Sequence, residues 1–150
     1  MIRDRASHLA VLVILVAAIA LQGNVAAAET ALPSTVAAGF DAYKSGGPQA
    51  AMTAWLKGGP LETDKQAQSQ SAMLLQIETY YGKFISASPL GSFEPRPGVT
   101  LTFAGLKYEK GPVFARFMTF RTGDKEAIVV LKFHTNPEEI FPSQLLYKSK

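Results

Sequence analysis

The sequence contains no cysteine and only two histidines among its 150 residues. Without cysteine there is no disulfide, no thiolate metal site and no cysteine nucleophile. His8 lies in an N-terminal segment that we expect to be removed, so imidazole chemistry would depend on His134 alone. The position of His134 directly after a strand favours a surface or capping role. We therefore expect no catalytic residue, no metal site and no cofactor.

A strong charge of one sign is also missing. The chain has 15 Lys and Arg against 12 Asp and Glu, which gives a formal net charge of +3, and it has no run of basic residues. Nucleic-acid binding needs clustered cations that neutralise successive phosphates. We therefore expect no nucleic-acid partner.

Only one long apolar run occurs, at residues 9–21, and a short cationic head precedes it. The run is shorter than the roughly 20 residues that cross a bilayer core, and small residues follow it at 25–28. This pattern predicts a cleaved secretory signal at 1–28, cut after Ala28, with an uncleaved anchor as the alternative. The remaining 29–150 would then form a single periplasmic domain with no stable membrane span.

Two turn segments, 44–48 and 57–60, divide the first third of this domain. Each contains Gly-Gly-Pro, because glycine ends one helix and proline opens the next. They predict two short helices, with apolar stripes at Val36, Ala37, Phe40 and Tyr43 and at Ala51, Met52, Trp55 and Leu56. A third, longer helix should begin at a capping box formed by Thr63 and Gln66 and end near Ser86.

From residue 99 onward the hydrophobic period changes to two, and β-branched and aromatic residues become frequent. This pattern predicts a short extended piece at 92–94 and then three strands, at 99–109, 113–121 and 126–133. The short connectors between the three strands predict antiparallel hairpins. A helical turn at 136–139 should follow, and the apolar residues within 140–146 should close one edge of the core.

An apparent phase change within the first of these strands predicts a β-bulge. Leu101 and Phe103 share one face, whereas Leu106 and Tyr108 take the other, and Ala104-Gly105 lies between them. A glycine at such a point is typical of a bulge, which bends the sheet into a concave shape. The sequence therefore predicts an α+β fold in which two short helices and one long helix pack on a curved antiparallel sheet of about four strands.

The element order resembles the nuclear transport factor two-like superfamily. The resemblance rests on the paired short helices around the two Gly-Gly-Pro turns at 46–48 and 58–60, and on three further segments, residues 80–83, 106–112 and 133–137. It implies a cone-shaped, cystatin-like fold. Because the superfamily includes isomerases, dehydratases, dimerising adaptors and ligand-binding modules, the resemblance implies an architecture and does not select an activity.

Five residues are candidates for binding a ligand. Alternation places Arg116 on the same strand face as Phe114 and Met118, where it could meet an anionic head group. The alternative is that this strand lies near an edge and that the arginine stem covers apolar neighbours. One of two adjacent tyrosines should pack in the core and the other border the cone mouth. The candidate set is Tyr80, Tyr81, Phe103, Arg116 and Met118.

The absence of paired catalytic groups favours a non-enzymatic exported domain. Such a domain would bind a small apolar or amphipathic molecule, or a protein partner, through its concave sheet. A second hypothesis is a small cofactor-independent lyase or isomerase that uses Tyr80 or Tyr81 with Glu78 and Arg116. A third is a homodimer formed through the sheet, because both faces of 113–121 carry apolar residues.

Overall fold

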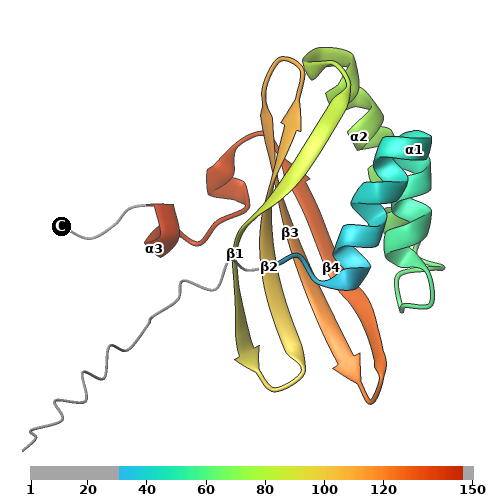
Figure 1. Ribbon diagram of the computed structural model, residues 1–150, viewed down its shortest axis with the longest axis vertical. Coiled ribbons are helices and arrows are strands. Elements are labelled where there is room, and N and C mark those ends of the chain that lie inside the picture. Colours follow the sequence, from blue (N-terminus) through green and yellow to red (C-terminus); the bar gives the residue numbers. More distant parts are fainter. Residues whose placement is uncertain (1–30, 147–150) are drawn as a thin grey trace, which may run out of the picture.

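The computed structural model describes residues 31–146, which form two helices packed on a four-stranded antiparallel sheet (Figure 1). The elements are α1 (Ser34–Leu56), α2 (Lys65–Tyr81), β1 (Phe84–Arg96), β2 (Val99–Tyr108), β3 (Pro112–Thr122), β4 (Lys125–His134), the 3-10 helix η1 (Pro137–Glu139) and α3 (Ser143–Leu146). The strands follow one another in sequence order across a curved sheet. The predicted α+β class is confirmed, while the predicted signal at 1–28 lies outside the described residues.

Helix α1 consists of two shorter helices that fold back on each other at Gly47. This glycine has φ 76°, a left-handed value that interrupts the helix, and Pro48 follows it. The indole Nε1 of Trp55 donates a hydrogen bond of 2.9 Å to the carbonyl of Val36, although the two residues lie far apart in sequence. In a straight helix they would be separated by about 28 Å. The prediction of two short helices divided by Gly-Gly-Pro is therefore confirmed.

The third predicted helix is present as α2, but both of its predicted ends are wrong. Its N-cap is Asp64 rather than Thr63, because the Asp64 carboxylate accepts a hydrogen bond of 2.8 Å from the amide of Ala67. The helix ends at Tyr81, with Gly82 as its C-cap, and does not continue to Ser86. The apolar residues that follow the cap, from Phe84 onward, belong to β1. The sequence pattern predicts them as the end of the helix, but they begin an edge strand.

Strand β1 is much longer than the predicted extended piece at 92–94. Its pairing with β2 has register shifts between Pro89 and Gly91 and between Phe93 and Arg96. Proline cannot donate a hydrogen bond to a neighbouring strand, so it is tolerated mainly on edge strands and at bulges. β1 is an edge strand, which explains how a segment containing prolines and glycines forms part of the sheet.

The β-bulge predicted at Ala104-Gly105 is wrong. β2 pairs with β3 without any register shift, and its side chains alternate regularly between the two sides of the sheet. Leu101 and Phe103 lie on one side and Leu106 and Tyr108 on the other simply because both sides bury apolar residues. The irregularity lies instead in β1, opposite this part of β2.

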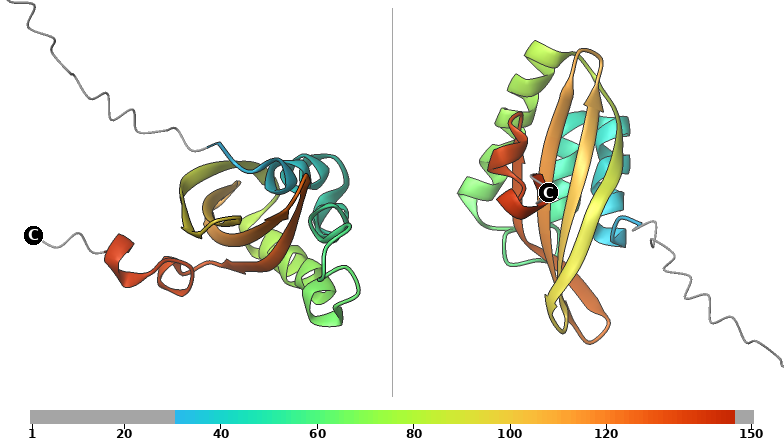
Figure 2. Two further views of the ribbon diagram at one scale, coloured as in Figure 1. Left: turned by 90° about the horizontal axis from the view of Figure 1, so that it is seen from below. Right: turned by 90° about the vertical axis from the view of Figure 1, so that its left-hand side faces the viewer.

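The core lies between the two helices and the inner side of the sheet, which we define as the side that faces α1 and α2. Trp55 lies at its centre. Its ring centroid lies 5.1 Å from that of Phe40 and 5.3 Å from those of both Phe117 and Phe133. Helix α1 contacts both edge strands, β1 and β4, so the curved sheet and the helices enclose these rings (Figure 2, left).

Gly39 provides the space for the Trp55 indole. A Cβ atom built on Gly39 would overlap with the indole ring. We expect Gly39→Ala to displace Trp55, weaken its hydrogen bond to Val36 and lower the free energy of unfolding by about 2–3 kcal/mol. Urea unfolding followed by Trp55 fluorescence measures this loss.

The matched control is Gly91→Ala, because no atom lies within 4 Å of a Cβ built on Gly91. We expect this variant to unfold within about 0.5 kcal/mol of the wild type. If Gly39→Ala were as stable as Gly91→Ala, the close contact between Gly39 and Trp55 would not limit packing.

Candidate functional site

The outer side of the sheet is the side turned away from α1 and α2. Strand register places Phe103, Arg116 and Met118 on it, whereas Ala115 and Phe117 point to the inner side. Figure 2 (right) turns the outer side toward the viewer, with η1 and α3 crossing part of it. Three of the five predicted site residues therefore lie together on one side of the sheet.

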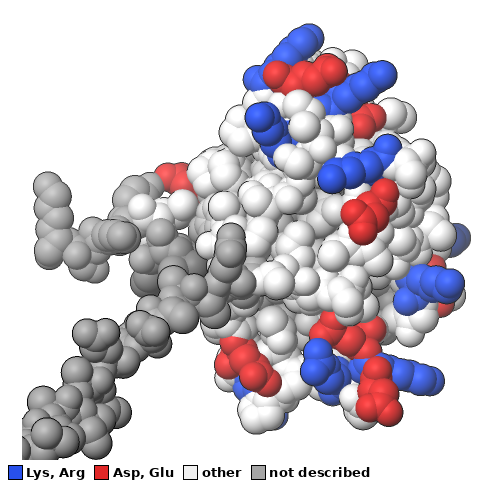
Figure 3. Space-filling view, in the orientation of Figure 1, with Lys and Arg blue, Asp and Glu red and all other residues white. Residues whose placement is uncertain are grey.

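One apolar residue from each strand forms a continuous row across the outer side. Phe93 pairs with Leu101, Leu101 with Met118, and Met118 with Val130. Phe93 and Val130, at the two ends of this apolar row, are 47% and 38% exposed. Figure 3 views the molecule at a right angle to the outer side, and the middle of the face that it shows is uncharged. Contiguous exposed apolar surface of this kind is typical of interaction sites.

Arg116 lies next to the apolar row, between Phe103 of β2 and Lys132 of β4. It is half-buried, and it forms no hydrogen bond or ion pair with any residue in the described part of the chain. The interpretation that its strand lies near an edge is wrong, because β3 is flanked by β2 and β4. β2 and β3 contain no aspartate or glutamate, so the two central strands carry positive charge only.

The segment after β4 covers one end of the outer side. The Phe141 ring centroid lies 5.2 Å from that of Phe103 and 5.7 Å from that of Phe114. The ammonium of Lys132 lies 3.1 Å from the Glu139 carboxylate, and this hydrogen bond lowers the pKa of Glu139. The predicted helical turn is confirmed as η1, capped by Asn136. However, the residues that follow η1 pack on the outer side and do not close an edge of the main core.

Two cavities lie side by side on the outer side, along β1. The first has a volume of about 330 Å³ and is lined by Leu90, Gly91, Ser92, Phe93, Phe103, Phe141 and Leu146. The second has a volume of about 520 Å³ and is lined by Ser88, Leu90, Gly105, Leu106, Lys107, Tyr108, Glu109, Gly111, Pro112 and Phe114. Both volumes fall within the range of about 300–1,000 Å³ that is usual for small-molecule sites. Leu90 lines both cavities and therefore stands between them.

Sequence reasoning missed Leu90 and Phe141 as parts of this site. Leu90 was missed because β1 was not recognised as a strand. The available signal was a large apolar residue set between Pro89 and Gly91, which is unusual for a surface loop. Phe141 reaches Phe103 of β2 and Phe114 of β3 because the chain reverses direction at η1. The sequence patterns of β2 and β3 give no indication of this contact.

Tyr80 and Tyr81 lie at the end of α2, and neither lines the two outer cavities. Tyr80 is 70% exposed, whereas Tyr81 is half-buried and packs against the inner core. Glu78 belongs to the same helix, while Arg116 points to the outer side. The sheet therefore separates Arg116 from the tyrosines and the acid that a lyase or isomerase built on this set would require.

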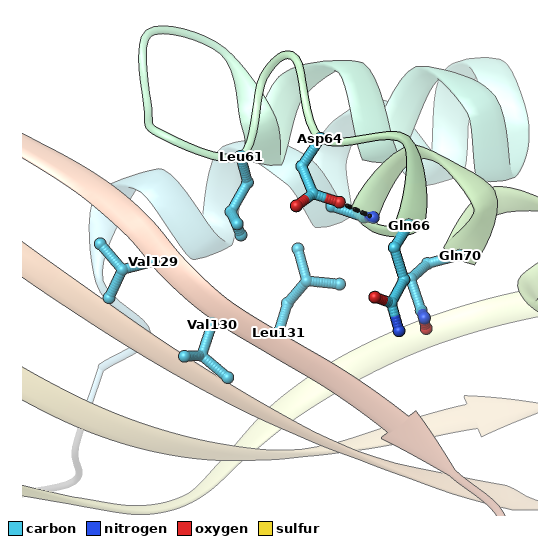
Figure 4. A pocket seen from close by; sticks show the side chains of 8 residues that line it. Leu61, Asp64, Gln66, Gln70, Val129, Val130 and Leu131 are labelled. Atoms are coloured by element: carbon cyan, nitrogen blue, oxygen red, sulfur yellow. Dashed lines mark hydrogen bonds between the residues drawn. The ribbon is translucent and has the colours of Figure 1, made fainter.

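A further pocket of about 220 Å³ lies between the start of α2 and β4 (Figure 4). Gln66 and Gln70 extend beside it from one face of α2, and Val129 and Leu131 line it from the strand. Its acidic side chain, Asp64, already caps α2. Within residues 31–146 no group of three or more His, Asp or Glu could hold a metal ion, and no helix there is long and apolar enough to cross a bilayer.

Two buried tyrosines on the inner side have perturbed acidity. The hydroxyl oxygens of Tyr43 and Tyr108 lie 3.1 Å apart. Burial raises the pKa of Tyr108 to about 12, and burial together with the Tyr108 hydroxyl raises that of Tyr43 further. Both phenols are neutral at physiological pH and form a buried hydrogen-bonded pair, and burial disfavours the ionised form of each.

Stability should fall as the pH rises above about 10. In that range a tyrosine in the unfolded chain loses its proton while folded Tyr108 keeps it, so the folded state binds more protons. We expect Tyr108→Phe to make this fall shallower by up to about 1.4 kcal/mol per pH unit. Urea unfolding between about pH 9 and pH 11 tests this, with exposed Tyr80→Phe as the control. Equal slopes for Tyr108→Phe and the wild type would contradict it.

The comparisons with known proteins give no relative for this arrangement. No protein-family model, no curated protein and no solved structure matches the chain.

Proposed function

We propose that this chain is a non-enzymatic binding protein that receives a small amphipathic anion on the outer side of its sheet. The observation that carries the proposal is Arg116, a half-buried cation on a central strand with no ion-pair partner among the described residues. A cation held partly out of water without a counter-charge is unfavourable, and an anionic group on the ligand would remove that cost.

The chemistry of the surroundings supports an amphipathic ligand. The guanidinium of Arg116 can bind a carboxylate, sulfate or phosphate through two hydrogen bonds. The neighbouring apolar row and the two outer cavities would cover an apolar body, which contributes about 25 cal/mol for each Å² of apolar surface removed from water. One charged end and one apolar body therefore match the two parts of the site.

A small molecule fits these observations better than a second copy of the chain. Hollows of this volume occur at small-ligand sites, and they interrupt the even face that a sheet-to-sheet homodimer would use. A second copy would also bring the cations of its own β2 and β3 toward Arg116, and these strands contain no acid to pair with them.

Export to the periplasm and membership in the nuclear transport factor two-like superfamily are further parts of the proposal. The apolar run at 9–21 and the small residues after it support export. The order of two short helices, one longer helix and a curved antiparallel sheet supports the superfamily assignment at the level of architecture alone.

Expression of the full chain in a bacterium should give a periplasmic protein whose intact mass begins at Glu29. The reason is that the apolar run is too short for a stable anchor and is followed by small residues that signal peptidase accepts. Mass spectrometry of the periplasmic fraction measures this. A full-length mass in the membrane fraction would instead support an uncleaved anchor.

Arg116→Gln should weaken binding of dodecanoate about tenfold, because a charge-assisted hydrogen bond contributes about 1.5 kcal/mol or more. Arg116→Lys, which keeps the charge, should lose less. Isothermal titration calorimetry of the full domain with dodecanoate, and with uncharged dodecanol, measures both the affinity and its dependence on the anion.

The control is Lys65→Gln, which removes one positive charge from α2 on the inner side of the sheet. This variant should bind dodecanoate as the wild type does, since a general loss of net charge has little effect at physiological salt. If Arg116→Gln and Lys65→Gln bound dodecanoate equally well, Arg116 would not be the head-group partner.

A further inference from the structure

Leu90 occupies an unusual position on the outer side of the sheet. It is 52% exposed, yet it forms a wall of both the first and the second cavity. Its exposure means that it contributes little to the main core, which lies on the other side of the sheet. A large apolar residue that is half-exposed between two apolar cavities is placed to shape them.

The backbone of β1 directs Leu90 to this place. Pro89 pairs with Ala104 and Gly91 pairs with Phe103, so Leu90 has no partner residue in β2. An unpaired residue of this kind is a bulge, which re-aims a side chain relative to regular alternation. Alternation from Pro89, which pairs with inward-facing Ala104, already places Leu90 outward, and because of the bulge Gly91, opposite Phe103, lies on the outer side as well.

Gly105 of β2 lies beneath the Leu90 side chain. A Cβ atom built on Gly105 would lie 3.3 Å from Leu90 Cδ1, which is closer than most side chains pack, and in ordinary contact with Leu90 Cγ at 3.5 Å. Because Gly105 has no side chain, Leu90 lies low against β2 at the boundary of the two cavities. The Leu90 side chain, packed over Gly105, therefore separates the two cavities.

Arg116 lines neither cavity, but it lies beside the first one, and a different cation lies at the second. Arg116 pairs with Phe103, which lines the first cavity, while exposed Lys107 lines the second. The acid at the second cavity, Glu109, accepts a hydrogen bond of 3.1 Å from the amide of Lys83. Phe103 is only 2% exposed, so an alkyl chain whose anionic head binds Arg116 would have to pass over its covered ring to reach the first cavity, where Leu90 forms the far wall.

From this geometry we infer that Leu90 sets the length of the alkyl chain that the outer side accepts. The occupant is an alkyl chain with one anionic head group, and the inference rests on the proposed function. A chain that fits the first cavity stops at Leu90, whereas a longer one must displace this side chain or leave its end in water. Removing Leu90 would join the two cavities into one longer channel.

The experiment compares octanoate, dodecanoate and hexadecanoate on the wild type, Leu90→Ala and Leu90→Phe by isothermal titration calorimetry. We expect Leu90→Ala to shift the ratio of dissociation constants about tenfold in favour of hexadecanoate over dodecanoate. Leu90→Phe, with a larger barrier, should shift preference toward octanoate. A simple dependence on surface hydrophobicity would instead make Leu90→Phe bind all three chains more tightly.

Leu75→Ala is the matched control, since Leu75 is 58% exposed and lies on α2, away from the outer side. Circular dichroism should show all variants folded, because both leucines are largely solvent-exposed. Unchanged chain-length preference in both Leu90 variants would overturn the inference while leaving the proposed function intact. Failure of the wild type to bind any of the three anions would overturn the proposed function itself.

Discussion

The fold depends on how Trp55 closes the helical hairpin of α1 onto the sheet. Its hydrogen bond to the Val36 carbonyl joins the two halves of the helix, and its ring packs against Phe117 and Phe133 of two different strands. Neither half of α1 is long enough to be stable by itself in water. The turn at Gly47 is therefore stabilised by the Trp55 indole, which holds both halves of α1 against the inner side of the sheet.

The sheet then divides the molecule into two chemically different sides. The inner side is filled with aromatic rings and with a buried tyrosine pair, and these groups stabilise the fold. The outer side carries an apolar row, two cavities and Arg116, none of which the inner core requires. Because stability is supplied by one side, substitutions on the other can change binding with little effect on folding.

Alternation and turn residues were enough to locate β2, β3 and β4 within about two residues, and to place Arg116 on the same side as Met118. The same alternation led to the wrong prediction of a bulge in β2. When a strand buries apolar residues on both sides, its sequence pattern resembles a change of phase although the strand is regular. β1 could not be recognised from its prolines and glycines. Because β1 was not recognised, Leu90 and the two cavities that it lines were not predicted either. The walls of these cavities come from strands that are paired through long-range contacts.

The prolines and irregular pairing of β1 also affect how the chain meets other molecules. Pro89 and Pro95 lack the amide hydrogen that an added strand would need, and on the opposite edge Val129 of β4 has no register partner. Both edge strands therefore contain interruptions of the kind that disfavour pairing with a strand of another molecule.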